Sequence, residues 1–232
     1  MKFISPHHKF FNQIHIDNYQ KKYFLDNYYR SRFFNFINHH EAIKKEICEI
    51  TQKIIIPSFK ININLNPYDD DTLVLHIRSG DIWSNNSNKD YVQNPLIYYL
   101  KLIKKFKKVL LVTEPDMKNP VIKKLLELDK VELKSKNLIE DIKTILKAKN
   151  FSSSGVGTFG IALSLISKNI KNFYFSNLYL NEHLNPSFLK YKTNLKLHKI
   201  NINNYLSEWN NTFLDNKILL EHNDISQSFK AL

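Results

Sequence analysis

The chain has little cysteine, little glycine and no long apolar run. Its 232 residues include one cysteine and four glycines. A single cysteine excludes an internal disulfide, and Cys48 falls on the apolar side of the helical pattern "AIKKEICEITQKIII", so we expect a buried thiol in a protein that works in a reducing compartment. Nowhere do about eighteen apolar residues follow one another, which excludes a membrane-spanning helix.

The N-terminal sequence "MKFISPHHKFF" has neither a continuous apolar core nor a small-residue cleavage site. A secretory signal peptide needs both of these features. Together with the expected reducing compartment, this pattern predicts a cytoplasmic protein that is not exported by a signal peptide.

Positive charge exceeds negative charge, because 34 Lys and Arg residues stand against 22 Asp and Glu residues and give a formal net charge of +12. Three partners fit this balance: nucleic acid, an anionic membrane surface and a small phosphorylated substrate. Stretches such as "YYLKLIKKFKK" space their lysines as a solvated helix face does. No zinc-ligand spacing, RNA-binding aromatic motif or arginine-rich arm accompanies them, so we expect no nucleic acid partner, while peripheral association with anionic lipid stays open.

Two kinds of pattern follow one another along the chain, and the change between them predicts a boundary. From about residue 18 to residue 56, apolar residues recur at three and four positions, which predicts two helices. After Asp71, short β-rich runs alternate with amphipathic stretches. We therefore predict a helical N-terminal subdomain over residues 1–68 and an α/β domain over residues 69–232.

Five strands and four intervening helices are expected in the second domain. The strand sequences are "LVLHI", "VLLVT", "VELKS", "NFSS" and "NFYFS", and the helices are expected at about 95–107, 120–128, 139–148 and 158–167. Strands that alternate with helices predict a mostly parallel, Rossmann-like sheet flanked by helices. A further amphipathic helix is expected over residues 203–222.

A polar cluster follows the first predicted strand, where "LVLHIRSGDIW" changes from apolar residues to "RSGD". Ligands of open α/β sheets bind outside the carboxyl ends of the strands, so the cluster lies where a ligand would bind. The guanidinium of Arg78 offers a planar fork of donors that suits a diphosphate. The alternative is an ion pair between Arg78 and Asp81 that closes a turn, with His76 as a satisfied core residue.

Two further polar clusters follow later strands. "TEPDMKNP" brings Glu114 and Asp116 to the end of the second strand, and its alternative interpretation is a loop in which Asn119 caps a helix. "SSSGVGTFG" precedes a helix, and its hydroxyls together with the first amides of that helix can bind an anion. Its alternative is an ordinary glycine turn, because it has neither a Walker A ending nor the GxGxxG pattern.

Taken in order, the three clusters resemble a known superfamily. "HIRSGD" looks like the HxRxGD motif of the fucosyltransferase-like GT-B glycosyltransferases, and "VLLVTEPDMKNP" is similar to their second motif, a strand that ends in acidic residues. "DIKTILKAKNFSSSGVGTFG" resembles the third motif, in which an aspartate opens a helix and a Ser/Thr-Phe turn follows a short strand. The resemblance covers roughly residues 73–175 and implies one GT-B-like half that binds a nucleotide sugar.

This resemblance implies roles for particular residues. Arg78 would bind the β-phosphate of the donor and stabilise the charge that develops as the sugar leaves, and Asp81 would orient Arg78 or contact a substrate. These two are the candidate catalytic residues. Asp141 would reach the base or ribose, with favourable placement near a helix dipole as its alternative. The other implied donor-binding residues are His76, Glu114, Asp116, Ser154, Gly155, Thr158 and Phe159.

The resemblance also implies an activity, which is metal-independent transfer of a sugar from a nucleotide sugar to a glycan or glycolipid acceptor. GDP-fucose is one candidate donor. No metal and no cofactor are expected, because arginine and a helix dipole would neutralise the phosphates. The enzyme would work in the cytoplasm or at the inner membrane face. Two other functions stay open: a non-catalytic domain that binds nucleotide sugars or glycans, and a basic nucleic-acid-binding protein.

One part of the superfamily pattern is missing from the sequence. Its members usually have a second Rossmann-like half, often opening with a glycine-rich loop, whereas all four glycines of this chain lie from Gly80 onward. We therefore expect an open apolar face around residues 23–36. A second copy of the chain, a partner lobe or further sequence would cover it.

Overall fold

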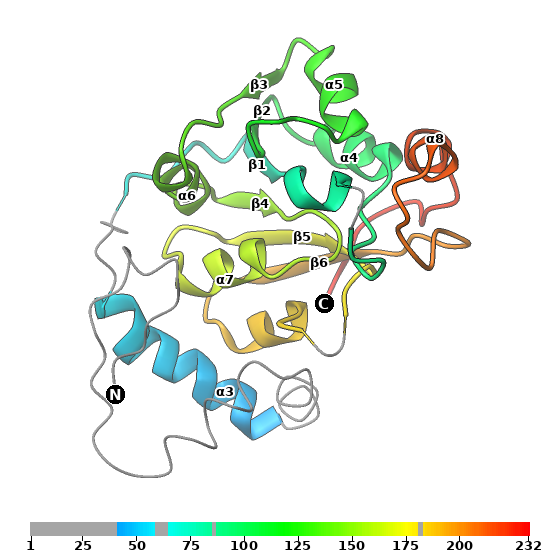
Figure 1. Ribbon diagram of the computed structural model, residues 1–232. Coiled ribbons are helices and arrows are strands. Elements are labelled where there is room, and N and C mark those ends of the chain that lie inside the picture. The colour runs from blue at the N-terminus through cyan, green and yellow to red at the C-terminus, as the bar shows by residue number, and fades with distance from the viewer. Residues whose placement is uncertain (1–40, 59–64, 85–86, 181–182) are drawn as a thin grey trace.

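The computed structural model describes residues 41–58, 65–84, 87–180 and 183–232, which form one seven-stranded sheet with helices on both faces (Figure 1). The strands are β1 (Thr72–His76), β2 (Lys108–Val112), β3 (Val131–Leu133), β4 (Asn150–Ser152), β5 (Asn172–Ser176), β6 (Lys196–Ile200) and β7 (Lys230–Ala231). Their order is β3-β2-β1-β4-β5-β6-β7, and only the β6–β7 pair is antiparallel. The expected Rossmann-like fold is confirmed.

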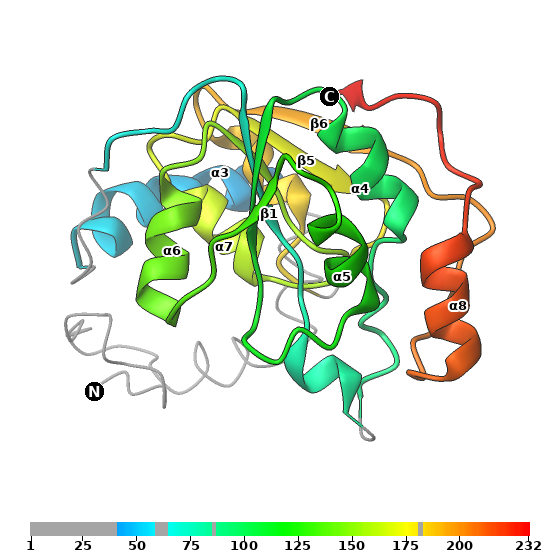
Figure 2. The ribbon, with the colours of Figure 1, turned by 90° about the horizontal axis from the view of Figure 1, so that it is seen from above.

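Helices form a layer on each face of the sheet, as Figure 2 shows. One layer holds α3 (Glu41–Ile50), α6 (Leu138–Leu146) and α7 (Phe159–Ile166), and the other holds α4 (Leu96–Ile103), α5 (Pro120–Leu126) and α8 (Phe213–Glu221). A π-helical turn (Thr51–Ile55) and a 3-10 turn (Ile56–Ser58) continue α3, and two more 3-10 turns are η4 (Gly80–Trp83) and η5 (Pro186–Tyr191). In the described part of the chain, no helix has the length and apolar character needed to cross a membrane.

Each face of the sheet has its own apolar core, because successive residues of a strand point to opposite faces. In β1, Val74 packs in the core under α6 and α7, whereas Leu73 and Leu75 pack in the core under α4 and α5. All three side chains are fully buried. Since β1 also pairs with a neighbour on each side, it gives the residues that follow it a rigid base.

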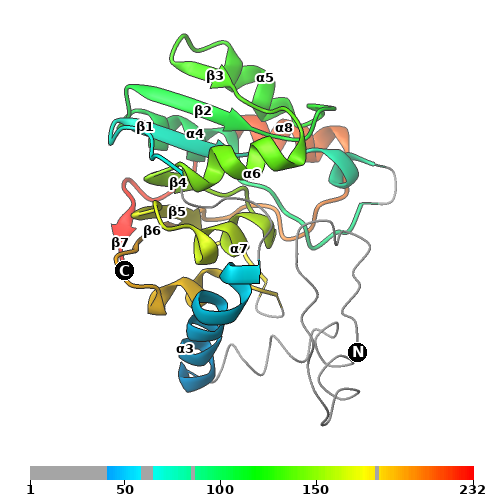
Figure 3. The ribbon, with the colours of Figure 1, turned by 90° about the vertical axis from the view of Figure 1, so that its left-hand side faces the viewer.

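The described part of the N-terminal segment shares a core with the sheet. Cys48 of α3 is buried in one cluster with Val74 of β1, and its thiol donates to the carbonyl oxygen of Phe188 in η5, 3.0 Å away. The expected buried thiol is thus confirmed. Figure 3 shows α3 at the β6 end of the sheet, far from β3. The first predicted helix and the face around residues 23–36 lie outside the described residues, so the subdomain boundary and the covering lobe stay predictions.

The prediction of a helix over residues 203–222 is wrong for its first half, because only Phe213–Glu221 is helical. Thr212 starts this helix in a capping box: its hydroxyl accepts from the N–H of Asp215, and the Asp215 carboxylate accepts from the N–H of Thr212. Two asparagines upstream have positive φ, which interrupts a regular helix. This non-helical segment carries Trp209, which is fully buried against η4.

Candidate functional site

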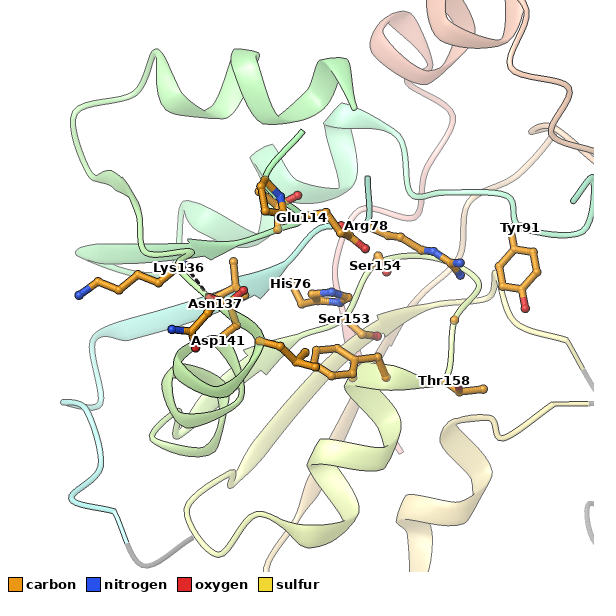
Figure 4. Close-up of a pocket in the computed structure, with 17 residues that line it drawn as sticks. His76, Arg78, Tyr91, Glu114, Lys136, Asn137, Asp141, Ser153, Ser154 and Thr158 are labelled. Atoms are coloured by element: carbon orange, nitrogen blue, oxygen red, sulfur yellow. Dashed lines mark hydrogen bonds between the residues drawn. The ribbon is translucent and has the colours of Figure 1, made fainter. Parts of the chain in front are cut away.

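A cleft of about 490 Å³ lies at the carboxyl ends of β1, β2 and β4. Arg78 from the first polar cluster, Glu114 from the second, and Ser154 and Thr158 from the third all line it. Figure 4 shows their side chains around one space. The structure therefore brings the three clusters together, as the parallel sheet predicts.

Three of the expected site residues do not line the cleft. The side chain of Asp81 is 76% exposed and pairs with Arg78. Asp116 is turned to the backbone of the "RSGD" turn, and Gly155 packs against the backbone of residues 92–94. Through these contacts, the three residues support the wall of the cleft.

Two neighbours of different kinds fix the guanidinium of Arg78. Its Nη2 donates to both carboxylate oxygens of Asp81, at 3.0 and 3.1 Å, and its central carbon lies 4.4 Å from the centre of the Tyr91 ring. The ion pair that the sequence offered as an alternative is therefore present. Nη1 takes no part in it and faces Gly157 across the cleft. Tyr91 lines the cleft and was not among the residues expected there.

The acidic residues of the second cluster bind the backbone of the first. Glu114 Oε2 accepts from the N–H of Ser79 at 2.6 Å, and Asp116 Oδ1 accepts from the N–H of Gly80 at 3.0 Å. Gly80 has a φ of +67°, in the left-handed region that favours glycine. Burial raises the pKa of Asp116, but hydrogen bonds from Ser79 and Gly80 outweigh this effect, so the pKa is lowered. Both carboxylates thus fasten the turn that carries Arg78.

Asn119 fastens the same turn from α5. Its Oδ1 accepts from the N–H of Val121 at 3.0 Å, so the expected helix cap is confirmed. In addition, its Nδ2 donates to the carbonyl oxygen of Arg78 at 3.0 Å, and its backbone N–H donates to Ser79 Oγ at 3.2 Å. One buried asparagine therefore starts a helix and anchors the turn after β1.

The third cluster forms a close-packed turn between β4 and α7. The N–H of Val156 donates to the carbonyl oxygen of Val92 at 2.9 Å. Two glycines are required by this packing. A Cβ on Gly155 would lie 2.5 Å from that same carbonyl oxygen, and a Cβ on Gly160 would lie 2.6 Å from the Cβ of Ser153. The turn is therefore held close to its neighbours, with its serines at the cleft.

The N-terminus of α7 points into the cleft without a side-chain cap. Thr158 occupies the N-cap position but makes no capping hydrogen bond, whereas Asn119 and Asn137 cap α5 and α6. The first N–H groups of α7 therefore have no side-chain acceptor at their cap, and the helix dipole adds partial positive charge there. An anion bound in the cleft would satisfy these amides.

His76 lies between the two ends of the cleft and is not the satisfied core residue of the alternative interpretation. It is 8% exposed, and its Nδ1 is buried without a hydrogen-bond partner among the described residues. Its ring packs on Phe159, with 5.0 Å between the ring centroids. Burial, and then the charge of Arg78, lower the pKa of His76 to about 4, so the ring is neutral at neutral pH. A neutral ring can face the cleft without repelling Arg78.

The start of α6 forms the other end of the cleft, opposite to Arg78 and Tyr91 (Figure 4). Asn137 caps the helix by accepting from the N–H of Glu140 at 3.1 Å, and Asp141 Oδ1 accepts from the N–H of Lys136 at 2.8 Å. Burial is the main cause that raises the pKa of Asp141. The guanidinium of Arg78 at one end and the half-buried carboxylate of Asp141 at the other make the cleft suitable for a ligand with two chemically different parts.

Neither metal ligands nor similarity to known proteins indicates the function of this cleft. In the ranges that the structure describes, no group of three or more His, Cys, Asp or Glu side chains is arranged to hold a metal ion. Comparisons of the chain with protein-family models, curated proteins and solved structures found no match. A function must be derived from the side chains of the cleft.

Proposed function

We propose that this chain is a glycosyltransferase whose cleft binds the diphosphate of a nucleotide sugar between Arg78 and the N-terminus of α7. One observation carries the proposal. Arg78 Nη1 and Ser154 Oγ converge on a single point from two walls, since a Cβ built on Gly157 would lie 3.9 Å from each of them. A guanidinium, a hydroxyl and uncapped helix amides are groups that bind phosphate oxygens.

The proposed reaction is a displacement at the anomeric carbon of the donor sugar. A hydroxyl of the acceptor forms the new C–O bond and its proton passes to solvent water, while the bond to the diphosphate oxygen breaks and leaves negative charge on the phosphate. Donors fixed in advance around that oxygen stabilise the transition state more than the ground state. An arginine side chain is a permanent cation. Asp81 and Tyr91 hold the orientation of Arg78. Arginine and helix dipole supply the positive charge, so the proposed reaction needs no metal.

The other end of the cleft would then take the nucleoside. Asp141 has one carboxylate oxygen bonded to the Lys136 N–H, and its other oxygen makes no hydrogen bond with a described residue. Such an oxygen can accept from a base or from a ribose hydroxyl. GDP-fucose is one candidate donor, and a glycan or glycolipid is the proposed acceptor, in the cytoplasm or at the inner membrane face.

Calorimetric titration with a panel of nucleoside diphosphates and nucleotide sugars tests this proposal. We expect one nucleoside diphosphate to bind, and the matching nucleotide sugar to be consumed when an acceptor glycan is present. Binding without turnover would reduce the chain to a non-catalytic nucleotide-sugar-binding domain. Salt-sensitive binding to oligonucleotides without any nucleotide affinity would contradict the proposal.

A further inference from the structure

Lysines mark the edge of the sheet at which the parallel strands begin. β2 and β6 start with Lys108 and Lys196, and β3, β4 and β5 each start directly after a lysine, at Lys130, Lys149 and Lys171. Parallel strands begin at one common edge, here called the amino edge. The five lysines therefore form a row along it, at the opposite end of the strands from the cleft.

Near β1 to β4, the lysines of this row are bound to other groups of the protein. Lys108 pairs with Glu132 at 3.0 Å, and Lys149 pairs with Asp70 at 3.0 Å, so acidic side chains neutralise both. The ammonium group of Lys130 keeps its charge but donates to the carbonyl oxygens of Ile103 and Phe106. These lysines are less available to a partner than unpaired ones.

Near β5 to β7, the positive charge is not neutralised. Lys105, Lys171, Lys196 and Lys230 are exposed there, and none of them makes an ion pair with any residue in the described ranges. We call these four residues the β5–β7 lysine patch. Figure 3 shows β7 beside β6, at the edge of the sheet.

Several contacts hold the four lysines around β6. The N–H of Lys196 donates to the carbonyl oxygen of Lys171 at 2.8 Å, and the antiparallel strand β7 places Lys230 opposite Lys199, further along β6. The Lys105 ammonium lies 5.1 Å from the ring centre of Phe229, the residue before β7. Burial, and then the charges of Lys105 and Lys196, lower the pKa of His198 in β6.

We propose that the β5–β7 lysine patch is the surface by which this protein binds an anionic lipid bilayer. Lysines near anionic headgroups strengthen membrane binding by about fivefold each. A nucleic acid fits the patch less well, because its cations are all lysines and its one aromatic ring, Phe229, already packs on Tyr98 and Tyr174. Arginine forks and free aromatic faces are the groups that read or stack on bases.

The position of the patch keeps the cleft accessible on a membrane. Lys171 and Lys196 lie at the amino edge, about 17 Å along the strands from the carboxyl ends that carry the cleft. Lys230 lies on β7, three strands away from β4, which is about 14 Å across the sheet. Membrane binding and nucleotide binding are therefore expected to be independent. A result that contradicts the lipid proposal would leave the proposed function unaffected, and the reverse also holds.

Vesicle co-sedimentation tests the proposal with two triple variants of equal charge. Vesicles of phosphatidylcholine alone are compared with vesicles that also contain phosphatidylglycerol. We expect the wild type to bind only the anionic vesicles, less strongly at high salt. The patch variant, Lys105→Gln with Lys196→Gln and Lys230→Gln, should lose about a hundredfold in affinity. Since all three side chains are exposed, its melting temperature should match that of the wild type.

The matched control removes three exposed lysines from other surfaces that also make no ion pair in the described ranges: Lys45→Gln, Lys123→Gln and Lys136→Gln. We expect it to bind anionic vesicles nearly as well as the wild type. Equal losses in the two triple variants would overturn the proposal, because binding would then follow net charge and not the patch. No binding of the wild type to anionic vesicles would also overturn it, as would oligonucleotide binding that only the patch variant loses while its vesicle binding persists.

Discussion

Tyr91 lies against the face of Arg78, with the guanidinium carbon 4.4 Å from the centre of the ring. Asp81 binds the edge of the same guanidinium through Nη2. The arginine is therefore oriented before a ligand arrives, with Nη1 turned to the third cluster. Orientation in advance is what makes a fixed charge effective in catalysis, because no reorganisation is needed during the reaction.

The ring of Tyr91, and not its hydroxyl, should support ligand binding. Tyr91→Phe keeps the cation–π contact, and we expect it to bind a nucleoside diphosphate like the wild type. Tyr91→Leu removes a contact of about 0.5–1 kcal/mol and should weaken binding by roughly two- to fivefold. Calorimetric titration distinguishes the two. Equal losses in both variants would assign the effect to the phenol hydroxyl.

The glycines of the third cluster should respond differently to alanine. Gly155→Ala and Gly160→Ala place a Cβ 2.5 Å from the Val92 carbonyl oxygen and 2.6 Å from the Ser153 Cβ. Each should lower the free energy of unfolding by about 1–3 kcal/mol, as overpacking does. Gly157→Ala meets nothing closer than 3.9 Å and should keep the stability of the wild type.

Nucleotide affinity gives this glycine series its second readout. The Cβ of Gly157→Ala would stand at the point on which Arg78 and Ser154 converge, so we expect weaker nucleotide binding by a fully stable variant. Urea denaturation and calorimetry on the same samples separate the two effects. Unchanged nucleotide affinity in Gly157→Ala would show that the phosphate binds elsewhere.

The loop after β1 depends on a tryptophan far along the chain. Trp209 is fully buried, and its Nε1–H donates to the carbonyl oxygen of Ile82 at 2.7 Å. Trp209→Phe keeps an aromatic ring but leaves this carbonyl without its donor, so we expect a loss of about 1–3 kcal/mol in the free energy of unfolding. Trp83→Phe is the control, since its partner Asn216 is partly exposed and can bond to water. Chemical denaturation that shows equal costs for both variants would contradict this role of Trp209.

The centre of the sheet could be predicted from the sequence, and its edge could not. β1, β2 and β5 are apolar runs because helices cover both of their faces, and such runs are visible in the sequence. β6, with the sequence "KLHKI", mixes exposed and buried positions, and β7 has two residues that pair only through β6. Neither strand has the regular alternation of apolar and polar residues that identifies a strand in a sequence.

The location of the site could be predicted, but not the partners of each side chain. Residues that follow parallel strands meet at one edge whatever their neighbours are. Glu114 was expected at the donor; it lines the cleft and also accepts from the Ser79 N–H, a contact that the sequence did not predict. Tyr91 reaches Arg78 only through tertiary packing. No local pattern in the sequence contains that contact.

His76 should make stability depend on pH. Burial and the charge of Arg78 lower its pKa from 6.5 to about 4 in the folded protein, so between these values the unfolded chain binds a proton that the folded protein does not. Stability should therefore fall as the pH drops from 6.5 toward 4, by up to about 3 kcal/mol. Glutamine does not titrate in this range, so the His76→Gln variant should lose less stability over the same drop in pH. Denaturation curves at several pH values measure the difference, and identical pH slopes would exclude His76 as the cause.

The central claim is that Arg78 binds a diphosphate through its planar fork, and the affinity of Arg78→Lys for the nucleoside diphosphate tests it most directly. Lysine keeps the charge and loses the two-pronged geometry. We predict that Arg78→Lys weakens binding about tenfold to a hundredfold, nearly as much as Arg78→Ala, with the melting temperature of the wild type. If Arg78 only closes a turn with Asp81, then Arg78→Lys, Arg78→Ala and Asp81→Asn would all lower the melting temperature and leave the nucleotide affinity of the folded protein unchanged, and that result would contradict the account.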